Sequence, residues 1–502
     1  MKKHTIILTL GILFSKVFGL LRETVLASFY GISVYADVYK VANDIPSVIF
    51  GFVAAGIVTT FIPIYSKIKE NKSEGEADAF LSNILNMLLI ISFVLCIFGY
   101  VFAEQLISVF AVGFKGETAA IAASFLRITI FSILFSSTKS LIEGFLQIKQ
   151  RFLTTVVSGL AMNVIVITAI VLSGLYKTPI IMAFGIVVSV MVQTLIGLFI
   201  AYKAGFRHTK KVNPVDSNVI DMMKMAAPII VGSSIDQINK TLDTTIASAV
   251  APGAIASLGY AVRVSDSILG IFVSSISSVL YPSLARQASQ GRIEELKVTI
   301  RKTMNTVNIL IVPATFGLMI LSRPVVDLLY RRLSPDAAIM TASALFFYTF
   351  GTVGYGLRQI LVRTFYALHD SVTPVVSGIF AIIINVSLNL LLAKHMGVGG
   401  LALATSISAL VSVVILYNAL RRKIGSLGTR EFLTTSAKIF VASSLMGLTV
   451  YGVHALVGGT MGLFASIGAG VIVYAIVLYF MKIEEADQIF SIVLKKLKSR
   501  KK

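Results

Sequence analysis

Apolar stretches of about 20 residues dominate the sequence, and this is the length at which an α-helix crosses the hydrocarbon core of a bilayer. Hydrophobic residues make up 56% of the 502 residues, charged residues only 14%, and the mean hydropathy is +0.87. Soluble domains carry about a quarter charged residues, so a soluble fold is excluded. The sequence predicts an all-α polytopic membrane protein with about fourteen transmembrane helices, over residues 5–29, 45–65, 81–103, 119–146, 154–172, 180–202, 226–250, 256–284, 304–321, 340–361, 374–393, 399–419, 437–457 and 461–481.

The Lys and Arg residues indicate how these helices are oriented. With an even number of spans both termini face one side. If that side is the cytoplasm, the inside segments hold about 28 Lys and Arg against about 7 in the outside segments. We therefore expect cytoplasmic N- and C-termini. The net charge of +20 is then explained by topology and by attraction to anionic lipid headgroups, and nucleic acid is not expected as a partner.

The N-terminus has the basic start and apolar core of a signal peptide. Lys16 interrupts this core, however, and no small-x-small cleavage pattern follows promptly. We therefore expect residues 5–29 to be retained as the first span. The segments between the predicted spans are all short, which leaves no room for a soluble catalytic domain.

The chain also repeats itself. GFVAAGIVTTFIPIYSK (51–67) aligns without gaps on GIFVSSISSVLYPSLAR (270–286), with Pro63 over Pro282. The VVSG of 145–159 aligns on the VVSG of 365–378 at the same offset, once one residue of slack is allowed. Two matches at one offset predict two related bundles of six helices, which run in the same direction because six is even. A substrate is then expected to bind between the bundles near mid-membrane.

This repeat divides the chain into five predicted parts. The linker and the tail among them are rich in Lys and Arg, as expected for cytoplasmic segments. The parts are an N-terminal six-helix bundle (1–202), a basic cytoplasmic linker (203–225), a C-terminal six-helix bundle (226–420), two additional helices (421–481) and a basic cytoplasmic tail (482–502).

Several ionisable residues lie inside or beside the first apolar spans. Each costs about 2.5 to 3.5 kcal/mol at membrane depth on insertion scales, so such groups usually face a partner or a water-filled cavity. Lys16 and Arg22 are about 120° apart around a helix, so both can border one broad cavity, and Glu23 can pair with Arg22. The alternative is that these cations snorkel to the interface at a helix end.

The second bundle opens with a similar group. Asp236, Lys240 and Asp243 are spaced i, i+4, i+7 and share one helical face, where the first two can form a local ion pair. Arg263 can pair with an acid three residues on, but the repeat places it over Asp44 of the first bundle. Matched positions of parallel repeats tend to face the same central space, so Arg263 is a predicted cavity residue.

Cations at mid-depth with few acids to neutralise them suit an anionic substrate. An Arg guanidinium holds phosphate oxygens bidentately, and a Lys ammonium acts as a point charge. A lipid-linked pyrophosphate fits such a cavity with its prenyl chain left in the bilayer, whereas a neutral or cationic drug does not. The five His residues are scattered without ligand spacing, so no transition-metal cofactor is expected.

Five segments of the sequence are characteristic in combination: SKVFGLLRE, YADVYKVANDIP, FIPIYSK, DTTIASAVAPGAIASLGYAVRV and FYALHDSVTPVV. Together they resemble the MurJ (MviN) family of lipid II flippases, within the multidrug/oligosaccharidyl-lipid/polysaccharide exporter superfamily, and the resemblance runs from about residue 8 to residue 480. It implies that undecaprenyl-pyrophosphate-linked peptidoglycan precursor (lipid II) is moved from the inner to the outer leaflet of the bacterial cytoplasmic membrane. No bond is broken, so the chain is expected to be a transporter in cell-wall biogenesis and not an enzyme. Cell-wall synthesis machinery is a possible partner, and a monomer is expected.

The resemblance also assigns substrate-binding residues. Basic residues of the family's first and eighth spans line a central cavity for the pyrophosphate, and by motif they fall on Lys16, Arg22 and Arg263. Glu23 occupies an acidic family position beside the arginine, and Asp37 occupies another in the following loop. The last two spans are implied to form a hydrophobic groove for the lipid tail.

A sodium site of the family, with Na+ as a coupling ion, maps onto Asp243, Asn385, Asn389 and Thr405. Asn385 and Asn389 are spaced i, i+4 and can both offer oxygens to a hard cation. The alternative is that both are amides that only pack helices together.

The sequence departs from the family pattern after the Pro of the second span. Many members carry two arginines there, where this chain has Phe50 and Gly51; an expected Glu is Ala55, and Lys16 replaces the commoner Arg. Another lipid-linked oligosaccharide or a drug therefore stays open as cargo. From other classes, the alternatives are a membrane glycosyltransferase, which usually presents acidic residues on sizeable outer loops, and a non-transporting cell-wall scaffold.

Overall fold

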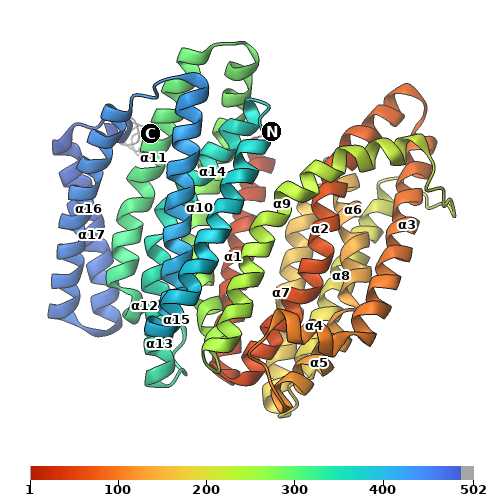
Figure 1. The fold of residues 1–502 in the computed structure, drawn as a ribbon, viewed down its shortest axis with the longest axis horizontal. Coiled ribbons are helices and arrows are strands. Elements are labelled where there is room, and N and C mark those ends of the chain that lie inside the picture. Colours follow the sequence, from red (N-terminus) through yellow and green to blue (C-terminus); the bar gives the residue numbers. More distant parts are fainter. Residues whose placement is uncertain (1, 488–502) are drawn as a thin grey trace. The chain divides into compact units, whose positions relative to one another are not determined.

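The computed structural model describes residues 2–487, and the regular elements of this part of the chain are helices (Figure 1). Eight helices of the described residues are long and apolar enough to cross a membrane. The pair α5 (Glu117–Thr129) and α6 (Ser132–Ile148), bent by 42° where the two helices meet, is also apolar enough and makes a ninth span if it is counted as one. The predicted all-α polytopic fold is confirmed. Side chains are not described at 2–10, 12–13, 52–55, 58, 228, 231–233, 235–236 and 268–282.

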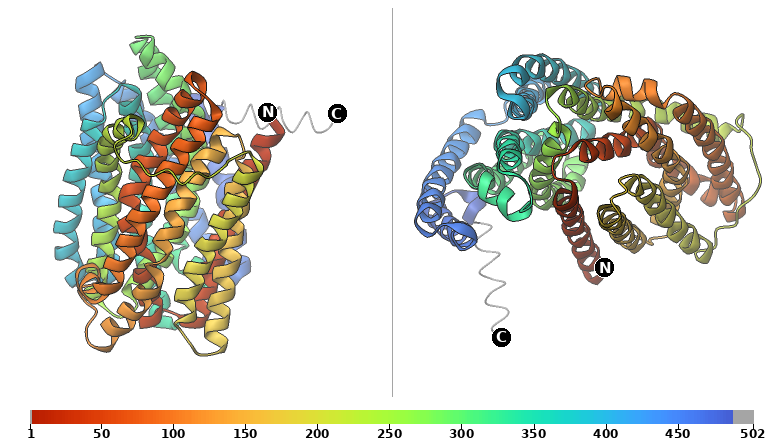
Figure 2. Two further views of the ribbon diagram at one scale, coloured as in Figure 1. Left: turned by 90° about the vertical axis from the view of Figure 1, so that its right-hand side faces the viewer. Right: turned by 90° about the horizontal axis from the view of Figure 1, so that it is seen from below.

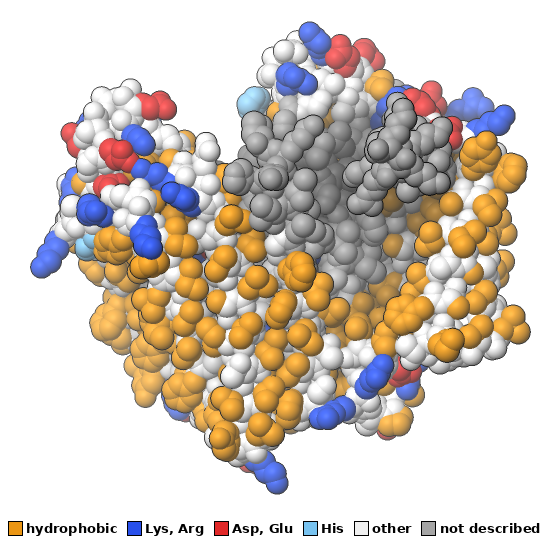
Figure 3. Space-filling model, turned by 180° about the vertical axis from the view of Figure 1, so that it is seen from behind, with side chains coloured by type: hydrophobic (Ala, Val, Ile, Leu, Met, Phe, Trp, Pro, Cys, Tyr) orange, Lys and Arg blue, Asp and Glu red, His pale blue; other side chains and the backbone are white. Residues whose placement is uncertain are grey.

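The distribution of side chains over the surface fits a membrane protein. Figure 3 shows hydrophobic side chains over the middle of the visible helices, whereas Lys, Arg, Asp and Glu gather near the helix ends. Large apolar side chains stay exposed on single helices, such as Phe93 and Val94 on α3 (Glu74–Val101). Such a surface would aggregate in water and is stable when covered by lipid.

The described chain forms two compact units, the first ending at Ala256 and the second beginning at Ser257. The first unit also contains α1 (Lys2–Tyr30), α2 (Val34–Asn71), α4 (Ala103–Phe110), α7 (Leu153–Leu175), α8 (Ile181–Lys203) and α9 (Ser217–Val250). From α10 (Ala254–Ser289) on, the second contains α11 (Ile293–Ile320), α12 (Ser322–Leu329), α13 (Pro335–Phe350), α14 (Thr352–Ala367), α15 (Val372–Ile424), α16 (Thr429–Val457) and α17 (Gly459–Met481).

Packing places the unit boundary later than the linker suggested by the repeat. Helix α9 is the first helix of the predicted C-terminal bundle, yet it packs along α2 within the first unit, where α1 packs against α7 (Figure 2). The linker 203–225 is also partly helical, because α9 already begins at Ser217. The basic tail predicted over 482–502 is described only as far as residue 487.

The helices themselves carry the predicted repeat. In the first unit a helix of 28 residues, α3, is followed by α4 with 8 residues. In the second unit α11 again has 28 residues and is followed by α12 with 8 residues. Each short helix is then followed by a pair with a short break, α5 with α6 and α13 with α14. The internal order of the two bundles is therefore the same.

The turns repeat as well. Glycine and three other residues adopt positive φ at matching places in both bundles, 219 or 220 residues apart. The matching pairs are Gln150 (φ 55°) with His369 (φ 56°), Lys177 (φ 54°) with Gly397 (φ 58°), and Gly205 (φ 102°) with Gly425 (φ 90°). Gly397 also divides the long α15 into the two spans predicted at 374–393 and 399–419, because its φ is not helical.

The predicted additional helices form the hairpin α16–α17, which packs against α11 (Figure 1). Its turn consists of Gly458 and Gly459, both with positive φ. Polar bonds join the hairpin and the residues just after it to α11. Tyr474 donates to the carbonyl of Ile309 at 2.8 Å, and Asn305 donates to the buried carboxylate of Glu485 at 2.9 Å. Arg301 and Lys302 of α11 also pair with Glu431 and Glu484.

The segment between α8 and α9 is bound to the polar stripe of α3, which consists of Asp78, Ser82, Asn83 and Asn86. Asn83 accepts from the amide of Asn213 at 2.6 Å and donates to its carbonyl at 2.9 Å. Asn86 donates to the carbonyls of Thr209 and Lys211, and Ser82 accepts from the amide of Thr209. These polar residues at the start of an apolar helix fix the course of the linker backbone.

Replacing Asn83 by alanine should release this segment. The two hydrogen bonds to the backbone of Asn213 are lost, and each contributes about 0.5–1.5 kcal/mol net. We expect trypsin to cleave the purified Asn83→Ala variant after Lys210 or Lys211 about tenfold faster than the parent. Asn163→Ala is the matched control, because this equally buried amide bonds only to Gly159 of its own helix. Equal cleavage rates in both variants would contradict the assignment.

Candidate functional site

A buried carboxylate joins two cations where α1 meets α2. Glu23 is 6% exposed, and its Oε1 accepts from Arg22 Nη2 at 3.2 Å. Its Oε2 accepts from Lys40 Nζ at 2.6 Å. One carboxylate therefore neutralises about half of the positive charge of its two partners.

The local sequence explains how these residues meet. Gly31 ends α1 with φ of +57°, a conformation that glycine adopts without steric cost. The chain reverses over three residues, so α2 starts at Val34. Residues 23 and 40 then lie at similar distances from the turn, on neighbouring helices. The predicted pairing of Arg22 with Glu23 is present, and Lys40 joins them.

Arg22 keeps hydrogen-bonding capacity beyond this pair. Its side chain is 18% exposed, and its Nε is buried with no hydrogen-bond partner in the described part of the chain. A guanidinium has five N–H donors in a fixed fork. Arg22 can therefore donate hydrogen bonds to an anionic ligand while it stays bonded to Glu23.

The α9 helix adds charge to the same region of the first unit. Asp44 of α2 is exposed, accepts from Asn43 Nδ2 at 3.1 Å and interacts electrostatically with Lys40, Glu23 and Lys240. Lys240 is exposed on α9, which packs along α2. The side chain of Asp236, its predicted partner, lies outside the described residues.

Asp37 has a different environment. It is 2% exposed in the first turn of α2; its Oδ2 accepts from the amide of Gly253 at 2.6 Å and its Oδ1 from the amide of Ala256 at 2.7 Å. These amides belong to the start of α10, so Asp37 acts as its N-terminal cap. Gly253 (φ +82°) is required here, because a Cβ would lie 1.9 Å from the carbonyl oxygen of Ile32.

The other predicted residues of the first unit lie along α1 and α2. Lys16 is half-buried on α1, six residues before Arg22 and thus about 9 Å along the helix. Phe50 is 5% exposed, whereas a Cβ at Gly51 would meet nothing within 4 Å. The side chain of Ala55 lies outside the described residues. Open space therefore remains at one of the two positions where arginines were expected.

Arg263 lies on α10 in the second unit and is half-buried. Its carbonyl accepts from Ser267 Oγ at 2.8 Å, a bond within the helix. Asp266, three residues on, is exposed. The convergence of Arg263 with Lys16 and Arg22 on one cavity stays a prediction.

Three of the four predicted sodium ligands form one buried group in the second unit. Asn385 donates to Thr405 Oγ1 at 3.1 Å, and Asn389 donates to Asn385 Oδ1 at 2.9 Å. Their exposed fractions are 4% or less. Asp243, 8% exposed, belongs to the first unit. Amide and hydroxyl oxygens are donors that a hard cation accepts, so the three residues of the second unit are chemically suited to sodium, and the participation of Asp243 stays a prediction.

Sequence reasoning missed two cations of the site. From the sequence alone, Lys240 is assigned only to a local ion pair, and Lys40 is given no role. The signal for Lys40 was its distance from the turn, which matches that of Glu23. For Lys240 no sequence signal exists, because only the packing of α9 on α2 brings it to Asp44.

The comparison with known families shows to which family the chain belongs. The sequence model described as "Lipid II flippase MurJ" matches residues 26–470. The chain belongs to this family. The MurJ resemblance of the five segments is thus confirmed, and membership of a flippase family makes the chain a transporter and not an enzyme.

Individual MurJ relatives match over most of their length. A protein of Rickettsia prowazekii is 29% identical over 419 residues, 82% of each chain, and one of Thermotoga maritima is 26% identical over 491 residues, 97% of this chain and 98% of the relative. Both are named "Probable lipid II flippase MurJ".

Solved structures share the fold. The structure titled "Lipid II flippase MurJ, inward closed conformation" matches with a TM-score of 0.83 and 24% identity, over 95% of this chain and 98% of the other. An inward-facing multidrug resistance MATE family transporter of the MOP superfamily matches with a TM-score of 0.69 and 14% identity, over 83% and 96%. Its likeness shows the fold and leaves the cargo open.

Asp37→Asn should weaken the first unit. An asparagine offers one carbonyl oxygen, so one of the two backbone amides at the start of α10 faces an NH2 group instead of an acceptor. We expect a loss of about 1–3 kcal/mol of stability, visible as a lower melting temperature of the purified protein in detergent. Asp44→Asn, at an exposed carboxylate, is the control and should leave the melting temperature nearly unchanged. An equal decrease in both variants would count against the cap.

Proposed function

We propose that this protein moves lipid II, the undecaprenyl-pyrophosphate-linked peptidoglycan precursor, from the inner to the outer leaflet by alternating access. The pyrophosphate binds to Lys16, Arg22 and Arg263, while the prenyl chain stays in the bilayer along the α16–α17 hairpin. Membership of the MurJ family and the names of its relatives support this cargo. The bundle repeat supports a mechanism in which two similar halves alternate.

One observation carries the proposal. Arg22 is held by buried Glu23 and still has a buried Nε without a partner among the described residues. A buried donor without an acceptor costs about 1–3 kcal/mol, and a phosphate oxygen removes this cost. Glu23 orients the guanidinium, and Lys40 supplies a second cation that prevents Glu23 from cancelling the charge of Arg22.

The sign of the charge favours a phosphate-bearing cargo over a drug. MATE transporters have the same fold, so the fold alone does not separate the two. Around Glu23, the cations Arg22, Lys40 and Lys240 outnumber the acids Glu23 and Asp44 by one charge. A cluster with net positive charge attracts a diphosphate and repels a cationic drug.

The membrane potential supplies a direction. With the cytoplasm negative, each negative charge that moves outward gains about 2.3 kcal/mol per 100 mV. A pyrophosphate diester carries two negative charges, so its outward transfer is favoured without ATP. The site must release the headgroup on the outer side, which the partial neutralisation of Arg22 by Glu23 assists.

Removal of the cations tests the proposal. In cells depleted of their resident flippase, Arg22→Ala and Arg263→Ala should each lower outer-leaflet lipid II at least about tenfold, since each removes a charge-assisted bond worth about 1.5–3 kcal/mol. A leaflet-specific assay of accessible lipid II measures this loss. Arg127→Ala is the control, because Arg127 pairs with Glu104 at the surface. Full complementation by both cavity variants would reject the site.

Sodium is proposed as a coupling ion, bound by Asp243, Asn385, Asn389 and Thr405. The oxygen donors and their burial support this choice. We expect the melting temperature of the purified protein to be higher in NaCl than in KCl at equal ionic strength, because a bound ion stabilises the folded state. The difference should vanish in Asn385→Ala and persist in Asn163→Ala. No difference between the two salts in the parent protein would contradict sodium binding.

A further inference from the structure

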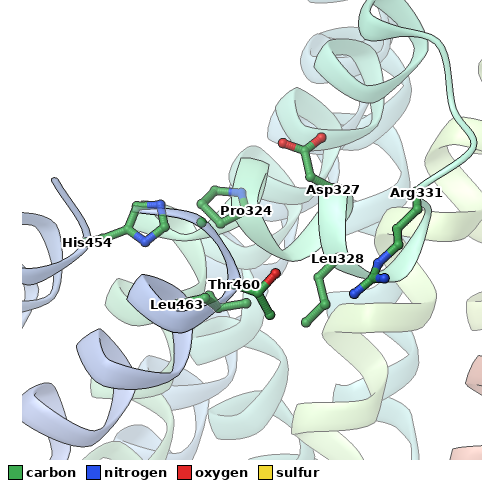
Figure 4. A pocket seen from close by; sticks show the side chains of 8 residues that line it. Pro324, Asp327, Leu328, Arg331, His454, Thr460 and Leu463 are labelled. Atoms are coloured by element: carbon green, nitrogen blue, oxygen red, sulfur yellow. The ribbon is translucent and has the colours of Figure 1, made fainter. Parts of the chain in front are cut away.

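The second unit has a polar pocket far along the chain from the proposed transport residues. It has a volume of about 240 Å³ and lies where α12 meets the turn between α16 and α17 (Figure 4). Arg331 and Asp327 line it from α12 and the residues after it, His454 from α16 and Thr460 from α17. By the predicted topology this pocket faces the outer leaflet.

The pocket is cationic although it contains an acid. Both oxygens of Asp327 accept from Arg323 Nε at 2.9 Å, so its charge is already neutralised. Arg331 has no hydrogen bond or ion pair within the described residues, and in Figure 4 its guanidinium lies on the Leu328 side of the pocket. The net charge available to a ligand is therefore positive.

The pocket also contains groups that can donate hydrogen bonds to an anion. His454 Nδ1 is buried and has no hydrogen-bond partner in residues 2–487. The pocket is also lined by Gly459 and Thr460, the first residues of α17. The first amides of a helix have no partners within the helix and carry partial positive charge. Together with the Thr460 hydroxyl, these groups form a set of donors suited to phosphate.

The surroundings of the pocket favour a lipid as the source of such a phosphate. The floor of the pocket includes Leu463, 2% exposed, which belongs to an apolar cluster with Leu321 and Val450. Outside the pocket, the same turn exposes Leu456 by 87%, Met461 by 80% and Phe464 by 62%. A polar pocket next to exposed apolar side chains matches a molecule with a charged head and acyl chains.

We propose that this pocket binds the phosphate of an anionic phospholipid, with Arg331 and His454 as its principal side-chain ligands. The acyl chains lie along the exposed apolar side of α17 near Met461. The site is separate from the residues proposed to hold the transported pyrophosphate, so it remains whether or not the cargo is lipid II. It would tie the end of the α16–α17 hairpin to the surrounding leaflet.

The chain contains no Trp, which permits a direct test with a single fluorescent reporter. Met461→Trp places the reporter beside Thr460. The full-length protein is reconstituted in vesicles of phosphatidylcholine with phosphatidylglycerol, and the acyl chains of one lipid at a time are brominated to quench Trp. We expect brominated phosphatidylglycerol to quench about twofold more than brominated phosphatidylcholine at the same mole fraction.

Three comparisons decide the outcome. The preference for phosphatidylglycerol should disappear when Arg331→Gln and His454→Gln are combined, and it should persist in Arg332→Gln, which removes the neighbouring charge outside the pocket. A reporter at Tyr479, also exposed on α17 but about 27 Å away by helix rise, should show no preference. Equal quenching by both lipids at Met461→Trp, or a preference that survives the double variant, would overturn the proposal.

Inorganic phosphate separates the two sources of the ligand. In detergent without phospholipid, the melting temperature is measured with and without millimolar phosphate. In the vesicle experiment, free phosphate is added as a competitor of the lipid. It should reduce the quenching by brominated phosphatidylglycerol only weakly, because the acyl chains add affinity. Stabilisation by free phosphate through Arg331 and His454, without any lipid preference in vesicles, would overturn the assignment to a lipid.

Discussion

The arrangement of the first unit depends on how its buried cations are stabilised between apolar helices. Arg22 and Lys40 remain charged among apolar helices because one buried carboxylate, Glu23, serves both. Without Glu23 the two cations would repel each other in a medium of low dielectric constant. With it, the group keeps about one positive charge, enough to attract an anion and weak enough to release it. The helix turn at Gly31 and the packing of α9 on α2 both serve to place charges around this carboxylate.

Asp37, a second buried carboxylate near the turn between α1 and α2, stabilises backbone structure. Asp37 binds the first amides of α10, and the repeat offset matches Asp37 with Ala256, one of the two residues that it binds. The two acids on the α2 side of the turn thus divide their roles. Asp37 fixes backbone, whereas Asp44 stays exposed and interacts with Lys240. A sequence motif that contains both cannot show the role of each acid, because the difference arises from residues about 200 positions away.

Much of the fold could be predicted from the sequence, because a helix that crosses a bilayer must be long and apolar. Helix length and apolarity indicated the spans, and two short alignments indicated a repeat that α3 with α4 and α11 with α12 reproduce. The pairing of Arg22 with Glu23 followed from adjacency. The roles of Lys40, Lys240 and the amides of Asn83 and Asn86 did not, since each depends on which helices pack together. Burial of a polar residue in an apolar stretch signals importance, but its partner is set by tertiary structure.

The paired turns of the two bundles have a consequence for how such proteins diverge. Gln150 and His369 share a positive φ, and Lys177 shares one with Gly397, although the side chains differ. A non-glycine residue in this region costs about 1–2 kcal/mol, and the chain tolerates that cost at the same corner in both copies. The two bundles therefore reverse their main chain at the same places, although different residues occupy these places. Residue identities at these turns would not reveal the repeat, whereas the sign of φ does.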